Sequence, residues 1–304
     1  MVHIKEATRQ HYVTITGCIS AEKIVYRNLK TITVSNQTIP TLFKGAVLNI
    51  PNLFDLQFQN NNIEGIKSHA FLNINVNSIS LNRNGIKWIE RYAFDNLLSL
   101  DLIDLDHNNL ETLHKNTFVN LPNLTFISFS HNKLNSFDHD WFSNTPKLDY
   151  LFINNNKIKN IPENAFSKFN KLEGITLEDN LIEYVHEKAF SGLERLSELH
   201  LNNNKLKYLN TDFNDAKSLR FLSIYKNELT YLPLDKFNLN EKSLKTIWVH
   251  ANPWKCSCFN EMGQWTVKRG IELWWKCENV DLFCYIPKVN PDVCQNATDR
   301  ELDS

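Results

Sequence analysis

An asparagine returns at nearly regular intervals along most of this chain, each time just after a short apolar segment. Residues 148–158 show the pattern, Leu-x-x-Leu-x-Leu-x-x-Asn-x-Leu, with isoleucine in two of the leucine positions. Successive copies are 23 to 25 residues apart. One such unit cannot bury its apolar face alone, so the copies must stack into a solenoid. The recurring residues, here called the ladder, are Gln37, Asn61, Asn84, Asn108, Asn132, Asn156, Asn180, Asn204, Asn227 and Asn252.

Each ladder residue is expected to turn its amide into the interior, behind the strand that precedes it. An asparagine amide offers two donors and an acceptor, and we expect these to bind the turn backbones of its own repeat and the next. A buried amide without partners would cost about 1–3 kcal/mol, so the ladder must run unbroken. Gln37 is one methylene longer, which suits a first repeat that has no predecessor.

A phenylalanine stands ten residues after most ladder positions. Periodic phenylalanine is typical of a core, so these rings should stack along the convex side of the solenoid. In the eighth unit Asn214 occupies the expected place and Phe213 comes one residue early, which predicts a local irregularity. The phenylalanines in register are Phe71, Phe94, Phe118, Phe142, Phe166, Phe190 and Phe237.

The cysteines are confined to the ends of the chain. Of the six, Cys18 lies near the start and the others lie within the last 50 residues. A cluster at one end is typical of a disulfide-bonded cap, which requires an oxidising compartment. Glycosylation sequons at Asn36, Asn123 and Asn296 agree with this interpretation. We therefore expect a secreted protein or an extracellular ectodomain.

The rest of the composition mainly excludes classes of partner. A net charge of -1 gives no general reason to expect nucleic acid or an anionic membrane as a partner. No apolar run approaches the roughly 20 residues that span a bilayer. The first residues lack the apolar core of a signal peptide. The sequence is then either a portion of a longer protein or never enters the secretory path, and the cysteines favour the first.

The C-terminal region carries a specific motif. Residues 252–258 read Asn-Pro-Trp-Lys-Cys-Ser-Cys, and Trp265, Cys277 and Cys294 follow. With the repeats, this motif resembles extracellular leucine-rich-repeat proteins of the 24-residue typical class, over residues 29–298. The motif itself is similar to the cysteine-rich C-terminal cap of Toll receptors and Slit. The asparagine- and phenylalanine-rich repeats are similar to arthropod Toll-like proteins and mosquito leucine-rich-repeat immune proteins.

The resemblance implies two disulfides, Cys256–Cys277 and Cys258–Cys294. A zinc site at Cys256 and Cys258 is the weaker alternative, because structural zinc sites use four ligands at other spacings. Cys18 and Cys284 are left over, and they should lie too far apart in a solenoid to form a disulfide. One interpretation makes Cys18 a buried thiol, or one paired outside this sequence, and Cys284 a plain thiol of the cap. The other makes Cys284 an intermolecular disulfide in a homo- or heterodimer, as in the mosquito immune complexes.

These features predict an α/β repeat solenoid, a leucine-rich-repeat horseshoe. Its parallel sheet should line the concave side, with irregular or 3₁₀ segments on the convex side. Residues 1–27 are expected to form an N-terminal cap that includes a strand at 12–16. Residues 28–251 should hold about ten repeats, residues 252–298 the cysteine-rich cap and residues 299–304 a tail.

The outward positions of the predicted strands between residues 101 and 203 are acidic. Eight acids and no Lys or Arg occupy them: Asp101, Asp104, Asp106, Asp149, Glu173, Glu178, Asp179 and Glu198. Basic residues lie on later strands or just past the ladder: Arg220, Lys226, Lys245, Lys133, Lys157, Lys159, Lys205 and Lys207. This segregation would attract a positively charged partner and repel nucleic acid. The alternative is a merely solvated acidic face.

Apolar side chains interrupt the acidic face. Leu102, Phe126 and Tyr150 share one slot on adjacent strands, about 5 Å apart, with Phe152 beside them. Exposed aromatics ringed by polar groups are typical of binding hot spots. Packing against a loop or a glycan is the alternative. A smaller patch comprises Phe221, Tyr225 and Trp248. The predicted ligand-binding residues are Leu102, Asp104, Asp106, Phe126, Tyr150, Phe152, Glu173, Glu178, Glu198 and His200.

Catalysis and metal binding are not expected. Asp106, His107, Ser130 and His131 include the side chains of a catalytic triad, but an open, solvated sheet offers no shielded oxyanion site. Asp101, Asp104, Asp106 and His107 could hold a divalent ion, yet their spacing resembles no calcium-binding loop. We predict no cofactor and no metal.

The sequence thus predicts a non-catalytic extracellular recognition module that binds a protein or peptide with basic patches on its concave face. The resemblance implies a role in innate immunity, as a recognition protein or co-receptor. The alternative is the ectodomain of a cell-surface adhesion or developmental signalling receptor.

Overall fold

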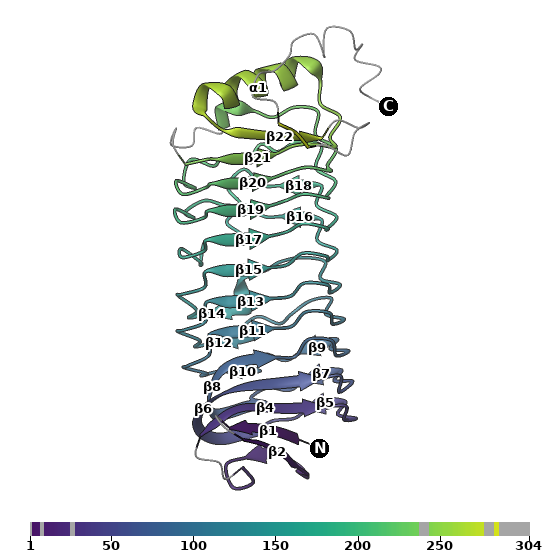
Figure 1. The fold of residues 1–304 in the computed structure, drawn as a ribbon, viewed down its shortest axis with the longest axis vertical. Coiled ribbons are helices and arrows are strands. Elements are labelled where there is room, and N and C mark those ends of the chain that lie inside the picture. The colour runs from purple at the N-terminus through teal and green to yellow at the C-terminus, as the bar shows by residue number, and fades with distance from the viewer. Residues whose placement is uncertain (1, 7–8, 25–27, 237–242, 277–282, 286–304) are drawn as a thin grey trace. The chain divides into compact units, whose positions relative to one another are not determined.

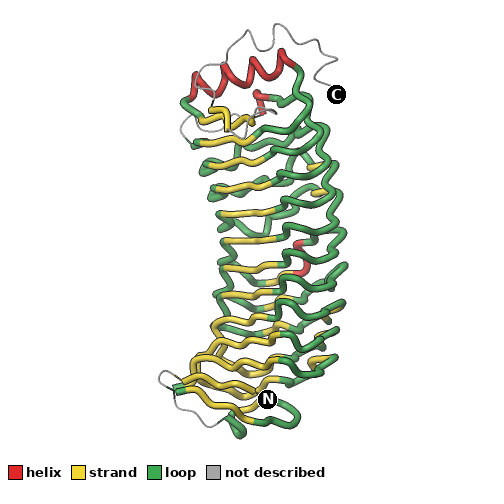
Figure 2. Tube along the Cα trace, turned by 45° about the vertical axis from the view of Figure 1, so that its right-hand side comes forward, coloured by secondary structure: helices red, strands yellow, loops and turns green. Residues whose placement is uncertain are grey.

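A computed structural model describes residues 2–6, 9–24, 28–236, 243–276 and 283–285 of the chain (Figure 1). The chain divides into two compact units, residues 1–156 and residues 157–304, which are described separately. In each unit the strands of the main sheet run along one side, and loops fill most of the other (Figure 2). Within the described residues, no helix is both long enough and apolar enough to cross a membrane.

In the first unit, the main sheet is a stack of parallel rungs with an antiparallel start. Strands β4, β6, β8, β11, β13 and β15 pair in parallel, whereas β1 pairs in antiparallel fashion with both β2 and β4. The predicted capping strand is present in part, as β2. The bounds are β1 (Val2–Glu6), β2 (Gln10–Val13), β3 (Ile19–Ser20), β4 (Leu29–Ser35), β6 (Val47–Gln59), β8 (Phe71–Ser80), β11 (Leu102–Asp104), β13 (Phe126–Ser128) and β15 (Tyr150–Phe152).

The strands of the early rungs are much longer than the rest. β6 has 13 residues and β8 has 10, whereas β11, β13 and β15 have 3 each. Register shifts between Ile50 and Phe54, and between Phe54 and Asp55, let β6 change direction without ending. The pairing of β6 with β8 therefore continues onto the side that we expected to be irregular.

Short parallel strands also occur away from the main sheet in the first unit. One small sheet joins β5 (Thr41–Leu42), β7 (Gly65–Ile66) and β9 (Trp88–Ile89), and another joins β10 (Phe94–Asp95), β12 (Phe118–Val119) and β14 (Phe142–Ser143). A 3₁₀ helix, η1 (His139–Trp141), interrupts the loops. The second small sheet begins at the phenylalanine spine. The rings of Phe71, Phe94, Phe118 and Phe142 are buried and stack with centroids 5.0–5.2 Å apart, as predicted.

The second unit continues the same design. Its main sheet pairs β19, β20, β21 and β22 in parallel, and β23 joins β22 in antiparallel fashion. Phe190 stacks on Phe166 at 5.5 Å, and Phe213 stacks on Phe190 at 5.9 Å despite coming one residue early. Phe237 lies outside the described residues. The bounds are β16 (Asn160–Ile161), β17 (Gly174–Thr176), β18 (Tyr184–Val185), β19 (Glu198–His200), β20 (Phe221–Ser223), η2 (Leu234–Lys236), β21 (Thr246–Trp248), α1 (Cys256–Arg269), β22 (Glu272–Lys276) and β23 (Phe283–Tyr285).

An α-helix follows the last ladder residue. α1 ends at Gly270, whose left-handed φ of 65° lets its N–H reach the carbonyls of Thr266 and Val267. The buried indole of Trp254 donates to the Val249 carbonyl at 2.8 Å. Cys277 and Cys294 lie outside the described residues, so both disulfides remain predictions.

The exposure of Cys18 bears on the interpretation that its thiol is buried. The Cys18 thiol is free and exposed, so the interpretation that it is a buried thiol is wrong. Cys284 lies on β23 in register with Trp275. Its intermolecular disulfide stays a prediction.

The ladder amides bind the backbone of their own repeat and of one neighbouring repeat, but that neighbour is not the one we expected. Asn108 donates to the Leu105 carbonyl of its own repeat at 2.9 Å. It also donates to the Leu81 carbonyl of the preceding repeat at 3.1 Å, and accepts from the Ile86 N–H there at 3.1 Å. The neighbour that the amide contacts is therefore the preceding repeat and not the next one. Gln37 turns its amide onto its own Ser35 carbonyl at 2.8 Å.

This pattern holds along both units, with the ladder amides buried or half-buried. In the first unit they are Asn61, Asn84, Asn108, Asn132 and Asn156. In the second they are Asn180, Asn204, Asn227 and Asn252.

The residue before each ladder position has a left-handed backbone. Its φ lies between 51° and 56° from Asn36 to Ala251. Asparagine, aspartate and histidine tolerate this region, and they fill most of these places. The exceptions are Arg83, Lys226 and Ala251.

Candidate ligand-binding face

Four apolar side chains gather on the sheet face of the first unit. Leu102 lies beside Phe126, and Phe126 beside Tyr150, in the parallel register. Phe152 follows on β15, with its ring centroid 4.9 Å from that of Phe126. Tyr150 is 38% exposed and the other three are half-buried. These four residues are called the central patch.

Asp104, beside the central patch, is engaged by hydrogen bonds. Its carboxylate accepts from the Ser80 hydroxyl at 3.2 Å and the Asn82 amide at 2.5 Å, both from the preceding rung. It also accepts from the backbone N–H of Asp106 at 3.0 Å. Asp104 therefore holds adjacent rungs together while it keeps a negative charge on the face.

Asp106 binds the serines of the following rung. It accepts from the Ser128 hydroxyl, and from the Ser130 N–H at 2.7 Å. Burial of this carboxyl raises its pKa, although these bonds act in the opposite sense. The serines are only 3% and 4% exposed, although Ser128 lies in register with Asp104 and Phe152 on the same face of the sheet. They are short and hydrogen-bond beneath longer neighbours.

The histidines next to these residues stack on each other. The rings of His107 and His131 are 4.1 Å apart and nearly parallel, at 5°. Burial is the main cause that lowers the pKa of His107, and the nearby His131 lowers it further. The Ser130 hydroxyl donates to Asn154 at 2.5 Å and not to an imidazole. The residues considered for a catalytic triad therefore lie close together, and among the described residues Ser130 forms no hydrogen bond with a histidine.

In the second unit, the predicted acids have different surroundings. Glu173 forms an ion pair with Arg195, which precedes β19 and is not one of its outward positions. Glu178 lies 3.7 Å from Nδ1 of His200. Glu198 is exposed. Burial lowers the pKa of His200, while the two nearby glutamates favour its charged form.

Aromatic side chains follow His200 along the same sheet. Phe221 meets Trp248 almost at right angles, with ring centroids 5.0 Å apart. Tyr225 lies 6.0 Å from Trp248 and stacks on His250 at 4.2 Å. Burial raises the pKa of Tyr225. The Trp248 indole N–H is buried without a hydrogen-bond partner among the described residues.

Trp274, whose ring lies 6.2 Å from that of Trp248, was not predicted from the sequence as part of this face. Its strand follows α1 and carries no repeat signal, so the repeat period could not place it.

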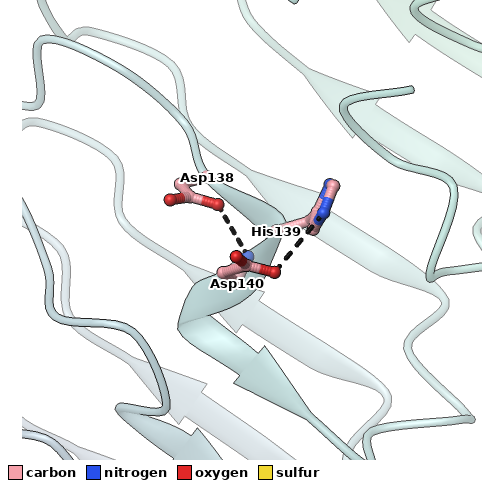
Figure 3. Close-up of side chains that lie close together, drawn as sticks. All are labelled: Asp138, His139 and Asp140. Carbon is pink, nitrogen blue, oxygen red and sulfur yellow. Dashed lines mark hydrogen bonds and ion pairs between the residues drawn. The ribbon is translucent and has the colours of Figure 1, made fainter. Parts of the chain in front are cut away.

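Metal-binding geometry occurs at a different place from the one considered in the sequence. Among the described residues, the acids and histidine that converge are Asp138, His139 and Asp140, around η1 (Figure 3). Asp138 caps η1 by accepting from the Asp140 N–H at 2.8 Å, and Asp140 pairs with Lys115 at 2.7 Å. A helix cap and an ion pair thus account for this cluster. Asp101, Asp104, Asp106 and His107 do not converge in this way.

A second asparagine ladder escaped the sequence analysis. It follows the phenylalanine spine by two residues, and its members have φ between 52° and 57°. The amide of Asn73 donates to Asn49 at 2.9 Å, that of Asn120 to Asn96 at 2.5 Å, and that of Asn144 to Asn120. Its own period of 23–24 residues in the sequence was the signal that could have found it.

Two of the predicted glycosylation sites can be placed. Asn36 is exposed, with a left-handed φ of 54°. Asn123 is also exposed, and its amide donates to the Leu98 carbonyl at 2.8 Å and accepts from Lys147 at 2.7 Å. Asn296 lies outside the described residues.

The sequence matches the family described as the BspA-type leucine-rich repeat region, in six copies, over residues 41–168 and 136–262. No curated protein matches it. Solved structures share the fold at low sequence identity. One is the Toll–Spatzle complex of Drosophila, with a TM-score of 0.69 and 20% identity over 85% of this chain and 36% of that one.

Two further solved structures share the fold. The complex of TLR13 with single-stranded RNA gives a TM-score of 0.58 and 19% identity, over 84% of this chain and 41% of that one. A leucine-rich repeat protein of Leptospira interrogans gives a TM-score of 0.56 and 15% identity, over 83% of this chain and 73% of that one. This chain thus spans less than half the length of the Toll and TLR13 chains. Because a protein of this fold was solved with RNA, the fold gives no support to the predicted exclusion of nucleic acid.

Proposed function

Because the chain belongs to the leucine-rich repeat family of the BspA type, we propose that it is a non-catalytic recognition protein whose sheet face binds a protein or peptide. The observation that carries this proposal is the central patch. Apolar side chains in register on three adjacent strands stay partly exposed there, with Tyr150 at 38%. An aromatic patch ringed by polar groups is typical of a binding hot spot.

The surroundings of the patch suit a preformed site. Each strand that carries it is followed by a ladder asparagine whose amide is fixed by backbone hydrogen bonds. A rigid platform loses little conformational entropy when a ligand binds. Asp104 and Asp106 add negative charge beside the patch, which favours a ligand with basic flanks.

The test uses peptides selected from a displayed random library for binding to the purified chain. The double variant Phe126→Ala/Tyr150→Ala should weaken binding at least about 100-fold, because anchoring aromatics dominate such interfaces. The matched control is Tyr12→Ala/Phe43→Ala, which removes aromatics that are 67% and 64% exposed outside the patch. Equal affinity for the patch variant and the wild type would reject the proposal.

Single-stranded RNA is the competing class of ligand, since TLR13 was solved with it. We expect no binding of an RNA oligonucleotide at physiological salt, because the patch is bordered by carboxylates that repel phosphates. RNA binding that disappears in Phe126→Ala/Tyr150→Ala would replace the peptide as the ligand of this face.

We propose an extracellular location for the protein, secreted or as an ectodomain. Its support is the cysteine cluster, with the disulfides Cys256–Cys277 and Cys258–Cys294, together with the sequons. Peptide mapping of protein secreted from eukaryotic cells should recover both bridges and glycans at Asn36, Asn123 and Asn296. Non-reducing electrophoresis tests the dimer. A dimer that Cys284→Ser abolishes supports the intermolecular bridge, and a monomer alone rejects it.

A role in innate immunity, as a recognition protein or co-receptor, is the finer proposal. The second candidate is the ectodomain of an adhesion or developmental signalling receptor, because the Toll structure is described as serving both development and innate immunity. The transcript beyond Ser304 distinguishes the two. A transmembrane helix or lipid-anchor signal there would favour the receptor, and a coiled coil would favour the secreted immune type.

A further inference from the structure

A groove of about 390 Å³ opens on the second unit, beside the small sheet of β16 and β18 and away from the main sheet. It is called the tyrosine groove. Its walls come from residues that immediately follow the ladder asparagines of successive repeats. The residues that carry the argument are Tyr184, Tyr208, Lys205, Lys207, Glu183 and Glu228.

The tyrosines of this groove are unusually open for large aromatic side chains. Tyr184 and Tyr208 each stand four residues after a ladder asparagine, and they are 38% and 55% exposed. Their ring centroids are 6.5 Å apart, and their planes meet at 69°. Neither hydroxyl makes a hydrogen bond within the described part of the chain.

The charges of the groove are also open. Among the described residues, the ammonium groups of Lys205 and Lys207 and the carboxylates of Glu183 and Glu228 form no ion pair. On the first unit, Lys87 and Glu64 occupy the same repeat positions as Lys207 and Glu183, and they pair at 2.9 Å. The repeat geometry therefore permits closure of this pair, and the tyrosine groove leaves it open.

We propose that the tyrosine groove binds a carbohydrate chain that carries carboxylate groups. The apolar C–H face of a sugar ring packs on an exposed tyrosine. Sugar hydroxyls donate to Glu183 and Glu228, and the ligand carboxylates accept from Lys205 and Lys207. A hollow of this volume suits a short oligosaccharide segment.

Nucleic acid fits the tyrosine groove less well. Single-stranded nucleic acid binds where bases stack on aromatic faces along a continuously positive groove. Tyrosine rings inclined at 69° cannot enclose a flat base between parallel faces. The two glutamates suit the hydroxyl donors of a sugar, whereas a phosphodiester group has no hydrogen to donate to them.

Calorimetric titration with a hyaluronan hexasaccharide tests the proposal, because this probe alternates carboxylate-bearing and neutral sugars. Tyr208→Ala should weaken binding at least about tenfold, the loss expected for an anchoring aromatic side chain. Lys205→Ala/Lys207→Ala should weaken it and reduce its dependence on salt. Tyr231→Ala is the matched control, since Tyr231 stands four residues after Asn227, is 51% exposed and does not line the groove.

Four outcomes would overturn the proposal. They are no binding at millimolar hexasaccharide, equal losses for Tyr208→Ala and Tyr231→Ala, equal binding of neutral chitohexaose, and RNA binding that Tyr208→Ala abolishes. Thermal melting checks that every variant is folded. The groove is distinct from the central patch, so Phe126→Ala/Tyr150→Ala should leave hexasaccharide binding unchanged, and the two proposals can fail independently.

Discussion

The flank of the repeats is closed at Gly65 and Trp88 in the first unit and open at the tyrosine groove in the second. In the first unit Trp88 lies flat over Gly65, where an added Cβ would come within 1.9 Å of the ring. The ammonium of Lys67 sits 4.9 Å from the ring centroid, and Lys87 pairs with Glu64. In the second unit these positions form the tyrosine groove, whose charges have no ion-pair partner among the residues that the structure describes.

The difference shows which positions of a rung are free to vary. The ladder and the phenylalanine spine run through both units with the same contacts, so they fix the backbone of each rung. The side chain four places after a ladder asparagine differs from rung to rung, from Gly65 and Trp88 to Tyr184 and Tyr208. Whether a side chain at this position covers the flank depends on the residue at the same position of the preceding rung. The Trp88 ring lies against the backbone there because Gly65 has no side chain.

The largest expected effect on stability comes from the ladder asparagines, which both units share. Asn108→Ala in the first unit and Asn204→Ala in the second should each lower the free energy of unfolding by about 3 kcal/mol, because each leaves several backbone groups unsatisfied. Urea denaturation measures both. Losses that differ by more than a factor of two would show that the ladder is not equivalent in the two units.

The closed flank depends on Gly65. Gly65→Ala should cost about 1–3 kcal/mol, because the new methyl group displaces the Trp88 ring. Asn160→Ala, at the equivalent place on the open flank, should change stability by less than about 0.5 kcal/mol. Adding Trp88→Ala to Gly65→Ala should cost less than the sum of the single changes. Additive losses would mean that the ring does not close the flank.

Histidines on the sheet faces should respond differently to pH. Burial lowers the pKa of His200 below its ordinary value of 6.5, so protonation disfavours the folded state. The associated stability is fully present above pH 6.5 and is lost as pH falls through the lowered pKa. His200→Gln should reduce the change in melting temperature between pH 7 and pH 5. His107→Gln, at an exposed ring, should flatten it less, and the reverse order would contradict this assignment.

The smallest expected effect is that of the flank charges. Lys87→Ala and Glu64→Ala should show a coupling energy within about 0.5 kcal/mol that disappears in concentrated salt, as exposed ion pairs do. The same double-mutant cycle on Lys207 and Glu183 should give no coupling. Measurable coupling there would show that the open pair closes in solution.

The sequence predicted the framework well because period and chemistry coincide there. An asparagine after each strand suited a buried amide, and spacing alone placed Phe94, Phe118 and Phe142 in the spine. Spacing also aligned Leu102, Phe126 and Tyr150 on adjacent strands. It could not tell which repeat a ladder amide contacts, because a period is the same in both directions.

Other features escaped because they depend on neighbours across rungs. The burial of Ser128 and Ser130 follows from longer side chains around them, and the ion pair of Glu173 with Arg195 from a residue before the strand. The length of β6 depends on bulges that cannot be predicted from the residue types. The open charges of the tyrosine groove became visible only against the closed flank, although the sequence already showed lysines past the ladder.

The left-handed residue before each ladder position makes the rungs thermodynamically unequal. Most rungs place asparagine, aspartate or histidine there, but Arg83, Lys226 and Ala251 adopt the same φ without a side chain suited to it. That conformation disfavours such residues by about 1 kcal/mol each. Local opening by hydrogen exchange should therefore be graded along the chain by the type of residue that adopts this angle, in rungs whose packed interiors are alike.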